Sequence, residues 1–582
     1  MGSADPLVSI AQPPAQSVGV LKLPAEIIFE ILSLLDVSDL LEVRKTCMDI
    51  CRLSQDRSVW LRMLLSQRSQ VPIPSPYDGD PTNATLTLGS DVLERLVLSI
   101  YYTERSWLLP RAPPIALGFP DQSVTARFSE QSGNTALFME VLADRWLLAI
   151  YNEGLLYIWD LFVNGNTPIS TYRRAGLAPE TNCRFSTQLS TDALLSSACA
   201  SLSEDNTMLF IATVSQQDIT VSSMQLPPHS DSNVTGSVEL TVHTIRVWKL
   251  PNPALSVRAI HPASNFAFFS YSDTLVLLQW DYGKVWQLQT IDPVNDEDFW
   301  TGVIAAKFIS PRHILCFKTH DVELLALPNT FSPNTGLSSG STSGTNVSHG
   351  LVPIRAFSHF FPGLTFRGVS VSDPEVSLSG IRAETRVRVS FLAYDILRGL
   401  FHFRVSVLLP PLADTSGDMP DIPPPHMAVR LLAVHRLAQL YTTSGDGVAN
   451  VPRSRSGFTP GSRGFVSACF MGRTGKRGVW IERRRGSMRR SVIAFSTALD
   501  ALDEDDFLDN EVHAAPAGEG SRLDSELEQQ DWTLQGEART IDGRVIYEVN
   551  SYDLRDDITH CAFAEAMGTV VLGNRKGDLN LL

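Results

Sequence analysis

The sequence predicts an α+β chain of two parts, a short helical segment followed by a long all-β region. Two observations support this division. Apolar residues between positions 21 and 67 recur at steps of three and four, as they do on one face of a helix. From about residue 120 onward, short runs of Val, Ile, Leu and aromatic residues alternate with Gly, Asn, Asp and Pro, as strands alternate with turns. A chain of 582 residues has room for two or three domains.

Three helices are predicted in the helical segment. The first begins near Pro24, which suits a first helical position because the N–H that proline lacks would have no intrahelical partner there. The second begins around Ser38 and Asp39, whose side chains can cap free amides, and the third begins near Asp56. A segment of about 45 residues buries little apolar surface, so we expect it to pack against a further surface.

Several spaced residues in this segment resemble the F-box family: Leu23-Pro24, Ile31-Leu32 with Leu35, Asp39-Leu40, Arg44, Cys47, and Asp56 followed by Trp60. The resemblance implies docking onto the Skp-type adaptor of SCF-class ubiquitin ligases. The positions that it assigns to adaptor binding are Leu23, Pro24, Ile27, Ile31, Leu32, Leu35, Leu40, Val43 and Trp60. The sequence departs from the family at Lys45-Thr46, where many members have an aliphatic residue before the cysteine. The alternative is an ordinary helical subdomain that packs on the chain's own β region.

The segments around the predicted F-box, residues 20–67, are expected to be less structured. Residues 1–19 are rich in Pro, Ala, Ser and Gln and are predicted to be disordered. Residues 68–119 are predicted to be a linker that contains a spacer helix from about Val92 to Arg105. Pro110 and the prolines after it end the helical pattern.

The region 120–582 repeats one hairpin pattern. Trp146–Tyr151 and Leu155–Leu161 predict two strands joined by a tight turn, and similar pairs return up to the last residue. Repeated hairpins with a Trp near the end of the third strand resemble a degenerate WD-repeat β-propeller of about seven blades, with six or eight possible. Only Trp159-Asp160 and Trp280-Asp281 keep the characteristic dipeptide. The alternative is a β-sandwich or two smaller β domains.

The chain ends on a predicted strand, whose open edge requires a partner. We expect Thr125–Phe128 or Ala136–Val141 to supply that partner and to close the ring. Polar, Ser/Gly-rich, Pro-rich or acidic composition predicts disordered insertions at 216–236, 329–350, 414–426 and 501–532.

We find no catalytic set, metal site or cofactor motif. The segment Gly336–Gly340 matches G-x-S-x-G, but it lies in a Ser/Gly tract and not between a strand and a helix. The seven cysteines are scattered, which suits a reducing cytoplasmic or nuclear location. No run of apolar residues is long enough for a membrane helix. The formal net charge of -15 argues against a general affinity for nucleic acid, so we do not expect nucleic acid as a partner.

Positive charge is concentrated from Arg453 to Arg490, with eleven Lys or Arg and a single acidic residue, Glu482. Guanidinium groups suit carboxylates and phosphates because two parallel N–H bonds reach one planar anion. One interpretation is a pocket for an acidic or phosphorylated protein substrate, formed by Arg473, Arg483, Arg484 and Arg485. The alternative is a solvated basic loop that is neutralised by the acidic run from Asp503 to Asp509.

Together these features predict a non-catalytic, substrate-recognition adaptor of an SCF-type ubiquitin ligase, with a Skp-type adaptor, a cullin scaffold and a protein substrate as partners. The alternative is a non-degradative propeller scaffold. The interpretation requires that Ile27, Ile31 and Leu35 are not covered by residues beyond Pro120.

Overall fold

The computed structural model describes residues 23–67, 71–73, 88–118, 135–163, 167–168, 183–190, 193–216, 218–227, 241–249, 255–271, 274–290, 302–328, 351–378, 385–396, 398–410, 425–437, 464–483, 487–497 and 539–582. The chain divides into two compact units. The helical unit comprises Met1–Ile73 and Tyr77–Tyr102, and the β unit comprises Pro74–Pro76 and Thr103–Leu582. No helix among the described residues is both long enough and apolar enough to cross a membrane.

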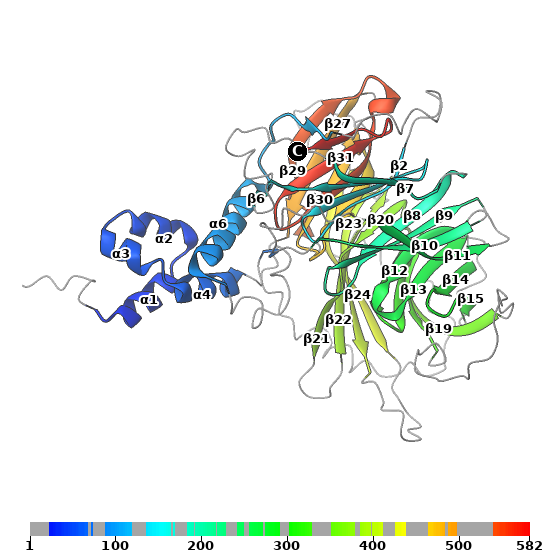
Figure 1. Cartoon of the computed structure of the whole chain (residues 1–582), viewed down its shortest axis with the longest axis horizontal. Coiled ribbons are helices and arrows are strands. Elements are labelled where there is room, and N and C mark those ends of the chain that lie inside the picture. Colours follow the sequence, from blue (N-terminus) through cyan, green and yellow to red (C-terminus); the bar gives the residue numbers. More distant parts are fainter. Residues whose placement is uncertain are drawn as a thin grey trace, which may run out of the picture. The chain divides into compact units, whose positions relative to one another are not determined.

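The described helices are α1 (Ala25–Ser33), α2 (Val37–Arg44), α3 (Met48–Leu53), α4 (Arg57–Gln67) and α6 (Ser90–Trp107) (Figure 1). The prediction of three helices before residue 68 missed α3. That helix has six residues and buries none of them, so it leaves no apolar stripe in the sequence. Its start is marked instead by Cys47, whose Sγ accepts the N–H of Ile50 at 3.5 Å. Helix α2 begins at Val37, earlier than predicted.

The core of the helical unit includes the helix that we predicted as a spacer. Leu93, Leu96, Val97 and Ile100 of α6 are buried together with apolar residues of α1, α2 and α4. The boundary between the two units lies within α6, after Tyr102. The helix therefore contributes most of its buried residues to the helical unit, where they enlarge a core that three or four short helices could not form alone.

The β unit is a seven-bladed propeller, which confirms the predicted fold (Figure 1). The strands of the first three blades are β2 (Ala136–Leu142), β3 (Trp146–Tyr151), β4 (Leu155–Asp160), β7 (Cys183–Gln188); β8 (Leu195–Leu202), β9 (Met208–Ser215), β10 (Asp218–Gln225), β11 (Val242–Lys249); β12 (Ser256–His261), β13 (Phe266–Tyr271), β14 (Thr274–Gln279), β15 (Lys284–Thr290). A short pair, β5 (Phe162–Val163) and β6 (Thr167–Pro168), follows β4.

The remaining strands form four more blades: β16 (Val303–Ser310), β17 (His313–Lys318), β18 (Asp321–Ala326), β19 (Leu351–Phe360); β20 (Gly368–Val371), β21 (Glu375–Leu378), β22 (Thr385–Asp395), β23 (Gly399–Leu409), β24 (His426–Arg436), β28 (Arg539–Thr540); β25 (Phe465–Met471), β26 (Arg477–Arg483), β27 (Arg489–Ser496), β29 (Arg544–Asn550); β30 (Ile558–Ala564), β31 (Thr569–Asn574), β32 (Leu579–Leu581), β1 (Ile115–Ala116). The first strands of neighbouring blades contact one another, so they line the inside of the ring.

The ring is closed by β1, which pairs antiparallel with the last strand, β32. The prediction of the closing strand was therefore wrong. Ala136–Val141 lies in β2, the first strand of the first blade, and Thr125–Phe128 lies outside the described residues. A strand of two residues cannot show the alternation by which strands are predicted. Only the pairing of Ile115 with Leu581 identifies it.

One predicted insertion is corrected by the second blade. Within 216–236, residues Asp218–Gln225 form β10, which pairs with both β9 and β11. Ile219 and Val221 of this strand are buried in the core. The Ser, Thr and Gln residues around them hide the alternation of apolar and polar residues by which a strand is recognised. The other three predicted insertions lie wholly or largely outside the described residues, and His426, inside one of them, is the first residue of β24.

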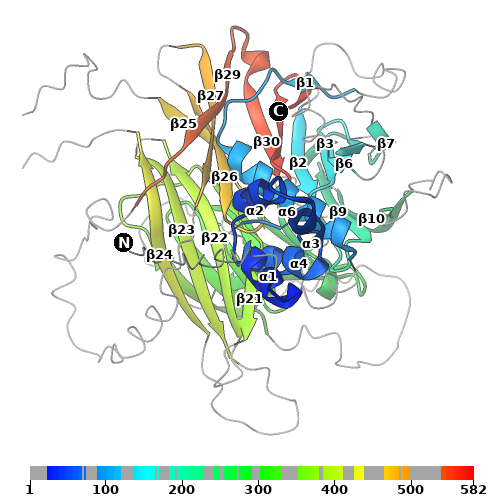
Figure 2. The same ribbon diagram turned by 90° about the vertical axis from the view of Figure 1, so that its left-hand side faces the viewer.

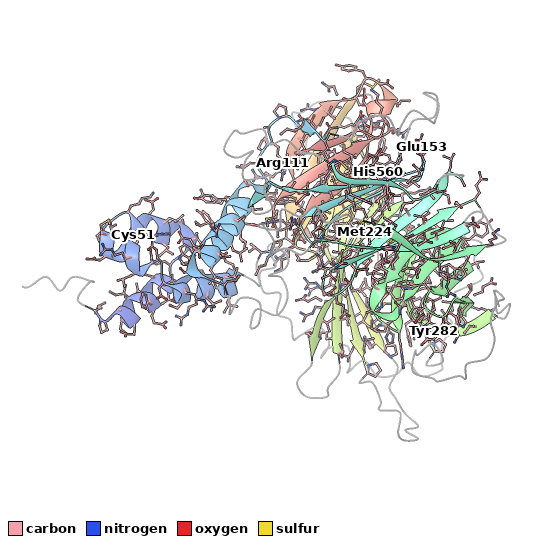
Figure 3. All side chains as sticks on the ribbon, viewed as in Figure 1. Cys51, Arg111, Glu153, Met224, Tyr282 and His560 are labelled. Atoms are coloured by element: carbon pink, nitrogen blue, oxygen red, sulfur yellow. The ribbon has the colours of Figure 1, made fainter. Side chains whose placement is uncertain are left out.

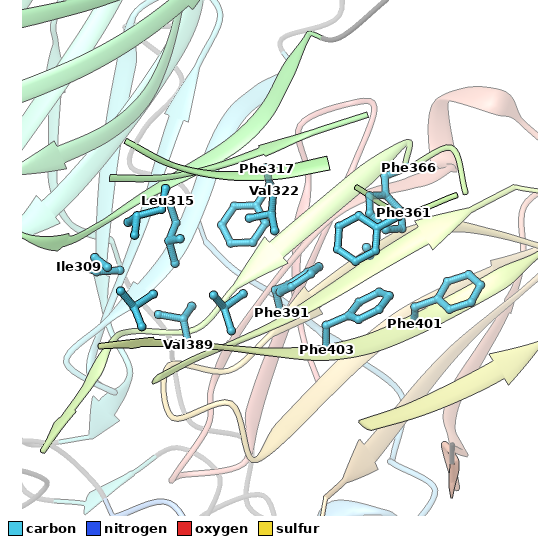
Figure 4. Packing of buried hydrophobic residues seen from close by; sticks show 14 of the residues in the cluster. Ile309, Leu315, Phe317, Val322, Phe361, Phe366, Val389, Phe391, Phe401 and Phe403 are labelled. Carbon is cyan, nitrogen blue, oxygen red and sulfur yellow. The ribbon is translucent and has the colours of Figure 1, made fainter. Parts of the chain in front are cut away.

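Two features distinguish this propeller. β15 pairs in parallel with β19, which joins the third and fourth blades into one sheet of eight strands. β22 and β23 have eleven residues each and run side by side with β24 in the fifth blade (Figure 2). The fifth blade packs on the fourth through phenylalanines (Figure 4). The rings of Phe317 and Phe391, one from each blade, lie 4.8 Å apart and are tilted, and Phe391 stacks on Phe403 of its own blade at 5.0 Å.

The chain enters the propeller through two residues at and beyond the end of α6. The Trp107 indole donates to the carbonyl of Phe495 at 2.9 Å. The guanidinium of Arg111, which is labelled in Figure 3, donates to the carbonyls of Gly568 and Leu582 at 2.7 and 3.2 Å. These bonds attach the segment before β1 to the sixth and seventh blades, so that β1 lies beside β32.

The first of the two Trp-Asp dipeptides carries a buried ion pair. Arg145 donates to Asp160 through two parallel hydrogen bonds of 3.0 and 2.8 Å, and both side chains are nearly inaccessible to solvent. The bidentate geometry offsets the cost of removing both charges from water. Asp281, from the second dipeptide, lies at the surface, where it accepts the N–H of Tyr282 at 2.9 Å and a bond of 3.3 Å from Asn265.

Replacing Asp160 by Ala should lower the free energy of unfolding by about 3–5 kcal/mol, because a buried guanidinium loses its bidentate carboxylate. Denaturant unfolding of the full chain, followed by tryptophan fluorescence, measures this. The matched control is Asp556→Ala, which removes a largely exposed pair with Lys576 and should cost less than about 1 kcal/mol. Equal effects of the two substitutions would contradict the prediction.

Candidate functional site

An exposed apolar stripe follows one face of α1. Leu23, Ile27, Ile31 and Leu34 are spaced by three or four residues and therefore lie above one another along the helix. Ile27 is 47% exposed, Ile31 is 40% exposed, and Leu34, the residue that ends the helix, is 81% exposed. Large apolar side chains gathered on one face and open to water indicate a surface that binds a partner.

The opposite face of α1 attaches the helix to the rest of the helical unit. Ile28 and Leu32 are buried in the core that also contains residues of α4. At the edge of this contact, Arg62 of α4 donates to Glu30 and to Ser33, each at 2.9 Å. The buried residues of α1 and the hydrogen bonds from Arg62 fix the orientation of the helix, so that its apolar stripe faces outward.

Trp60 lies at the centre of the helical core and is completely buried. The guanidinium of Arg44, on α2, lies 5.7 Å from the centre of its ring, and Arg44 also forms a 2.6 Å ion pair with Glu94 of α6. Trp60 of α4 therefore packs at a point where α2, α4 and α6 meet.

The nine residues predicted for adaptor binding divide by exposure. Those that are exposed are Leu23, Pro24, Ile27 and Ile31. Those that are buried are Leu32, Leu40 and Trp60, and those that are half-buried are Leu35 and Val43. Sequence periodicity treats both faces of a short apolar helix alike, so this division required the structure. Exposed Leu34 and Met48 were not among the nine, although their apolar character was visible in the sequence.

Within the helical unit, the three residues on which the ligase interpretation depends differ in exposure. Ile27 and Ile31 are exposed, and Leu35 packs against the core of the helical unit, whose members all precede residue 102.

The basic segment does not form one pocket. Arg473 lies in the turn between β25 and β26, whereas Arg483 is the last residue of β26. A strand of seven residues spans about 20 Å, so these two side chains lie at opposite ends of the sixth blade. Arg484 and Arg485 lie outside the described residues. The predicted pocket of four arginines is therefore wrong in placing Arg473 with Arg483.

Arg473 belongs instead to a charged cluster on the inside of the ring. Its Nε lies 2.7 Å from one oxygen of Asp373, and Lys307 Nζ lies 2.5 Å from the other. The carboxylate thus links the fourth, fifth and sixth blades. Glu140, on β2, faces the same cluster, and burial raises its pKa to about 7 although Lys307 and Arg473 oppose the shift. The cluster satisfies its own charges, so it indicates a structural role more than a ligand site.

No group of three or more His, Cys, Asp or Glu side chains capable of holding a metal ion exists among the residues that the structure describes. Cys47 and Cys51 lie one helical turn apart in the helical unit, and both are free thiols (Figure 3). The sulfur of Cys47 is used to cap α3.

Comparison with known proteins gives one match to a family, described as F-box-like, over residues 20–66. No curated protein matches the chain. The chain therefore carries an F-box-like domain followed by a seven-bladed propeller.

Three solved structures are similar to this chain, and two of them are WD40 domains. The WD40 domain of SCAP from fission yeast is 9% identical, with 77% of this chain and 84% of that chain covered and a TM-score of 0.34. The C-terminal WD40 domain of Sif2 is 9% identical, with coverages of 77% and 97% and a TM-score of 0.35. The Chaetomium thermophilum polycomb repressive complex 2 is 10% identical, with coverages of 82% and 98% and a TM-score of 0.38.

The two faces of α1 predict opposite effects of neighbouring substitutions. Leu32→Ala should lower the free energy of unfolding of the helical unit by about 2–5 kcal/mol, because it leaves a cavity in the core. Ile31→Ala should lower it by about 1 kcal/mol at most, because 40% of the residue is already exposed. Circular dichroism at 222 nm during thermal unfolding checks both, and a larger loss from Ile31→Ala would show that the stripe is covered.

The raised pKa of Glu140 predicts that Glu140→Gln stabilises the propeller only at higher pH. Folding favours the protonated carboxyl, so below the ordinary value of 4.5 the substitution should have little effect. As the pH rises through about 7, the native chain must carry a buried carboxylate and loses stability that the glutamine variant keeps. The melting temperatures of the two proteins should therefore differ at pH 8 and converge near pH 4.5. A constant difference across this range would contradict the assignment.

Proposed function

We propose that this chain is a substrate-recognition adaptor of an SCF-type ubiquitin ligase, acting in the cytoplasm or nucleus. The helical unit binds a Skp-type adaptor that is held by a cullin scaffold, and the propeller binds a protein substrate. The observation that carries the proposal is the exposed apolar stripe of α1, within the segment that matches the F-box-like family.

The stripe has the composition of a protein contact. Leu23, Ile27, Ile31 and Leu34 present exposed aliphatic side chains, and the neighbouring carboxylate of Glu30 is paired with Arg62. Interface energy concentrates in a few such anchors that become fully buried on binding. Met48, exposed at the start of α3, extends the apolar surface of the same unit.

The buried members of the predicted set have a different role in this proposal. Leu32, Leu40 and Trp60 hold the helices in place, and their contribution to binding is to maintain the shape of the surface. Leu35 and Val43 are half-buried, so each can serve both the core and the contact.

The mechanism is proximity. A substrate held by the propeller and a ubiquitin-charged enzyme held through the adaptor become parts of one assembly, which raises the effective concentration of each toward the other. In this mechanism the chain supplies binding and orientation, and the bond-forming groups belong to other subunits.

Replacing Leu23 and Ile31 by Asp should abolish co-purification with a Skp-type adaptor, because two charges would have to be buried in an apolar contact. The propeller should remain folded, which near-ultraviolet circular dichroism reports. The control is Ala25→Asp, which adds a charge to an exposed position of the same helix, about 160° around its axis from the stripe. Adaptor capture by the double variant at the level of the unmodified chain would exclude the proposed contact.

Reconstituted ubiquitin transfer separates the two candidate roles of the assembly. A substrate receptor transfers ubiquitin to proteins captured by the propeller, and transfer is lost in the Leu23→Asp, Ile31→Asp variant. A non-degradative scaffold binds the adaptor without modification of the captured proteins, and this result would replace the receptor role with the scaffold role.

A further inference from the structure

The turn that joins β26 to β27 contains a serine directly after a run of arginines. From Arg483 to Met488 the sequence reads Arg-Arg-Arg-Gly-Ser-Met, so Arg484 and Arg485 stand three and two positions before Ser487. Nowhere else in the 582 residues is a pair of arginines followed, after one intervening residue, by Ser or Thr. The proposed contact with the adaptor uses none of these residues.

Ser487 is accessible in the folded protein. The residue is partly exposed, and the next residue, Met488, is 53% exposed. The Ser487 hydroxyl accepts the backbone N–H of Arg489 at 3.0 Å and donates to no residue that the structure describes. The carbonyl of Met488 accepts the N–H of Ser551 at 2.9 Å. The hydroxyl therefore lies near the surface and keeps its own proton for transfer.

An enzyme that binds its substrate in an extended groove can read this turn without unfolding the blade. The pairing of β26 with β27 begins at Arg483 and Arg490, on either side of the turn. Release of the turn as far as Met488 breaks the hydrogen bonds to the Ser487 hydroxyl and to the Met488 carbonyl, and it leaves the pairing of these strands intact. Turns held by few hydrogen bonds open locally more often than paired strands do.

A second serine with basic neighbours is inaccessible. Ser491 directly follows Arg489 and Arg490, but it lies within β27, between β26 and β29. It is 5% exposed, and its hydroxyl donates to the carboxylate of Glu548 at 3.2 Å. The two serines have similar neighbours in the sequence, and the structure exposes Ser487 while it buries Ser491.

We propose that Ser487 is a phosphorylation site for a serine kinase whose substrate groove presents carboxylates. Arg484 and Arg485 suit such a groove because each guanidinium can form two parallel hydrogen bonds with one carboxylate. The Ser487 oxygen attacks the terminal phosphorus of Mg-ATP, and the bond from that phosphorus to the bridging oxygen of ADP breaks. The hydroxyl proton passes to the catalytic aspartate of the kinase.

Phosphorylation changes the charge at this end of the sixth blade. The phosphate carries a charge of about -1.5 to -2 at pH 7, and it replaces a neutral hydroxyl. The new charge lies beside the exposed side chain of Met488 and next to the backbone N–H of Arg489. A partner that binds here with acidic groups is therefore disfavoured by the modification. The site itself does not depend on the proposed ligase function.

Incubation of the full chain with Mg-ATP and the catalytic subunit of cyclic-AMP-dependent protein kinase, an enzyme of this class, tests the site. Mass spectrometry should find the phosphate on Ser487, and Ser487→Ala should abolish its incorporation there. The variant Arg484→Gln with Arg485→Gln should slow the initial rate about tenfold or more, because charge-assisted hydrogen bonds to the kinase are lost. The matched control is Ser491→Ala, which should keep the rate of the unmodified chain.

Three results would overturn the proposal: total incorporation that is unchanged in Ser487→Ala, a rate that is unchanged in the double arginine variant, or labelling of Ser487 only after the chain is unfolded by heat. A synthetic peptide of residues 482–490 gives the rate for the unfolded sequence, and the folded chain should reach that rate within about tenfold if the turn opens. Circular dichroism should show each variant folded, since the substituted residues lie in the turn. Adaptor capture is a separate readout, so failure here leaves the proposed function untouched.

Discussion

Helix α1 has apolar side chains on two faces, and the helical unit covers only one of them. Ile28 and Leu32 point into a core in which Trp60 is fully buried, and this packing leaves Ile27 and Ile31 in water. Apolar surface left in water costs free energy that a partner can recover on binding. The functional argument depends on this constraint, because the same contacts that stabilise the unit also orient the stripe outward.

The propeller is organised by a second constraint, the pairing of strand edges. β1, near the start of the β unit, pairs with β32 at its end and closes the ring. The parallel pairing of β15 with β19 covers two strand edges that would otherwise be open. Ionised side chains inside this frame are paired, as in the bidentate contact of Arg145 with Asp160 and the bridging of Lys307 and Arg473 by Asp373.

The parts of the fold that could be predicted are those whose burial repeats regularly. The apolar steps of α1 and the hairpin of β3 and β4 were visible because buried positions recur at the period of a helix or a strand. α3 and β1 were missed because six and two residues are too few to show a period. β10 was missed because its buried Ile219 and Val221 lie among polar residues, which gave the segment the composition of a loop. The predicted grouping of Arg473 with Arg483 failed because nearness in the sequence was taken for nearness in space.

The amino-acid sequence alone determined the order of the two parts, the F-box resemblance and the repeating strands of the propeller, because these depend on residue type and on spacing over a few positions. Tertiary structure decided which apolar residues of α1 remain exposed, which strand closes the ring, and that β26 separates Arg473 from Arg483. Each of these outcomes depends on contacts between residues far apart in the chain. Such contacts select one face, one edge or one end of an element, and the local pattern is the same whichever is selected.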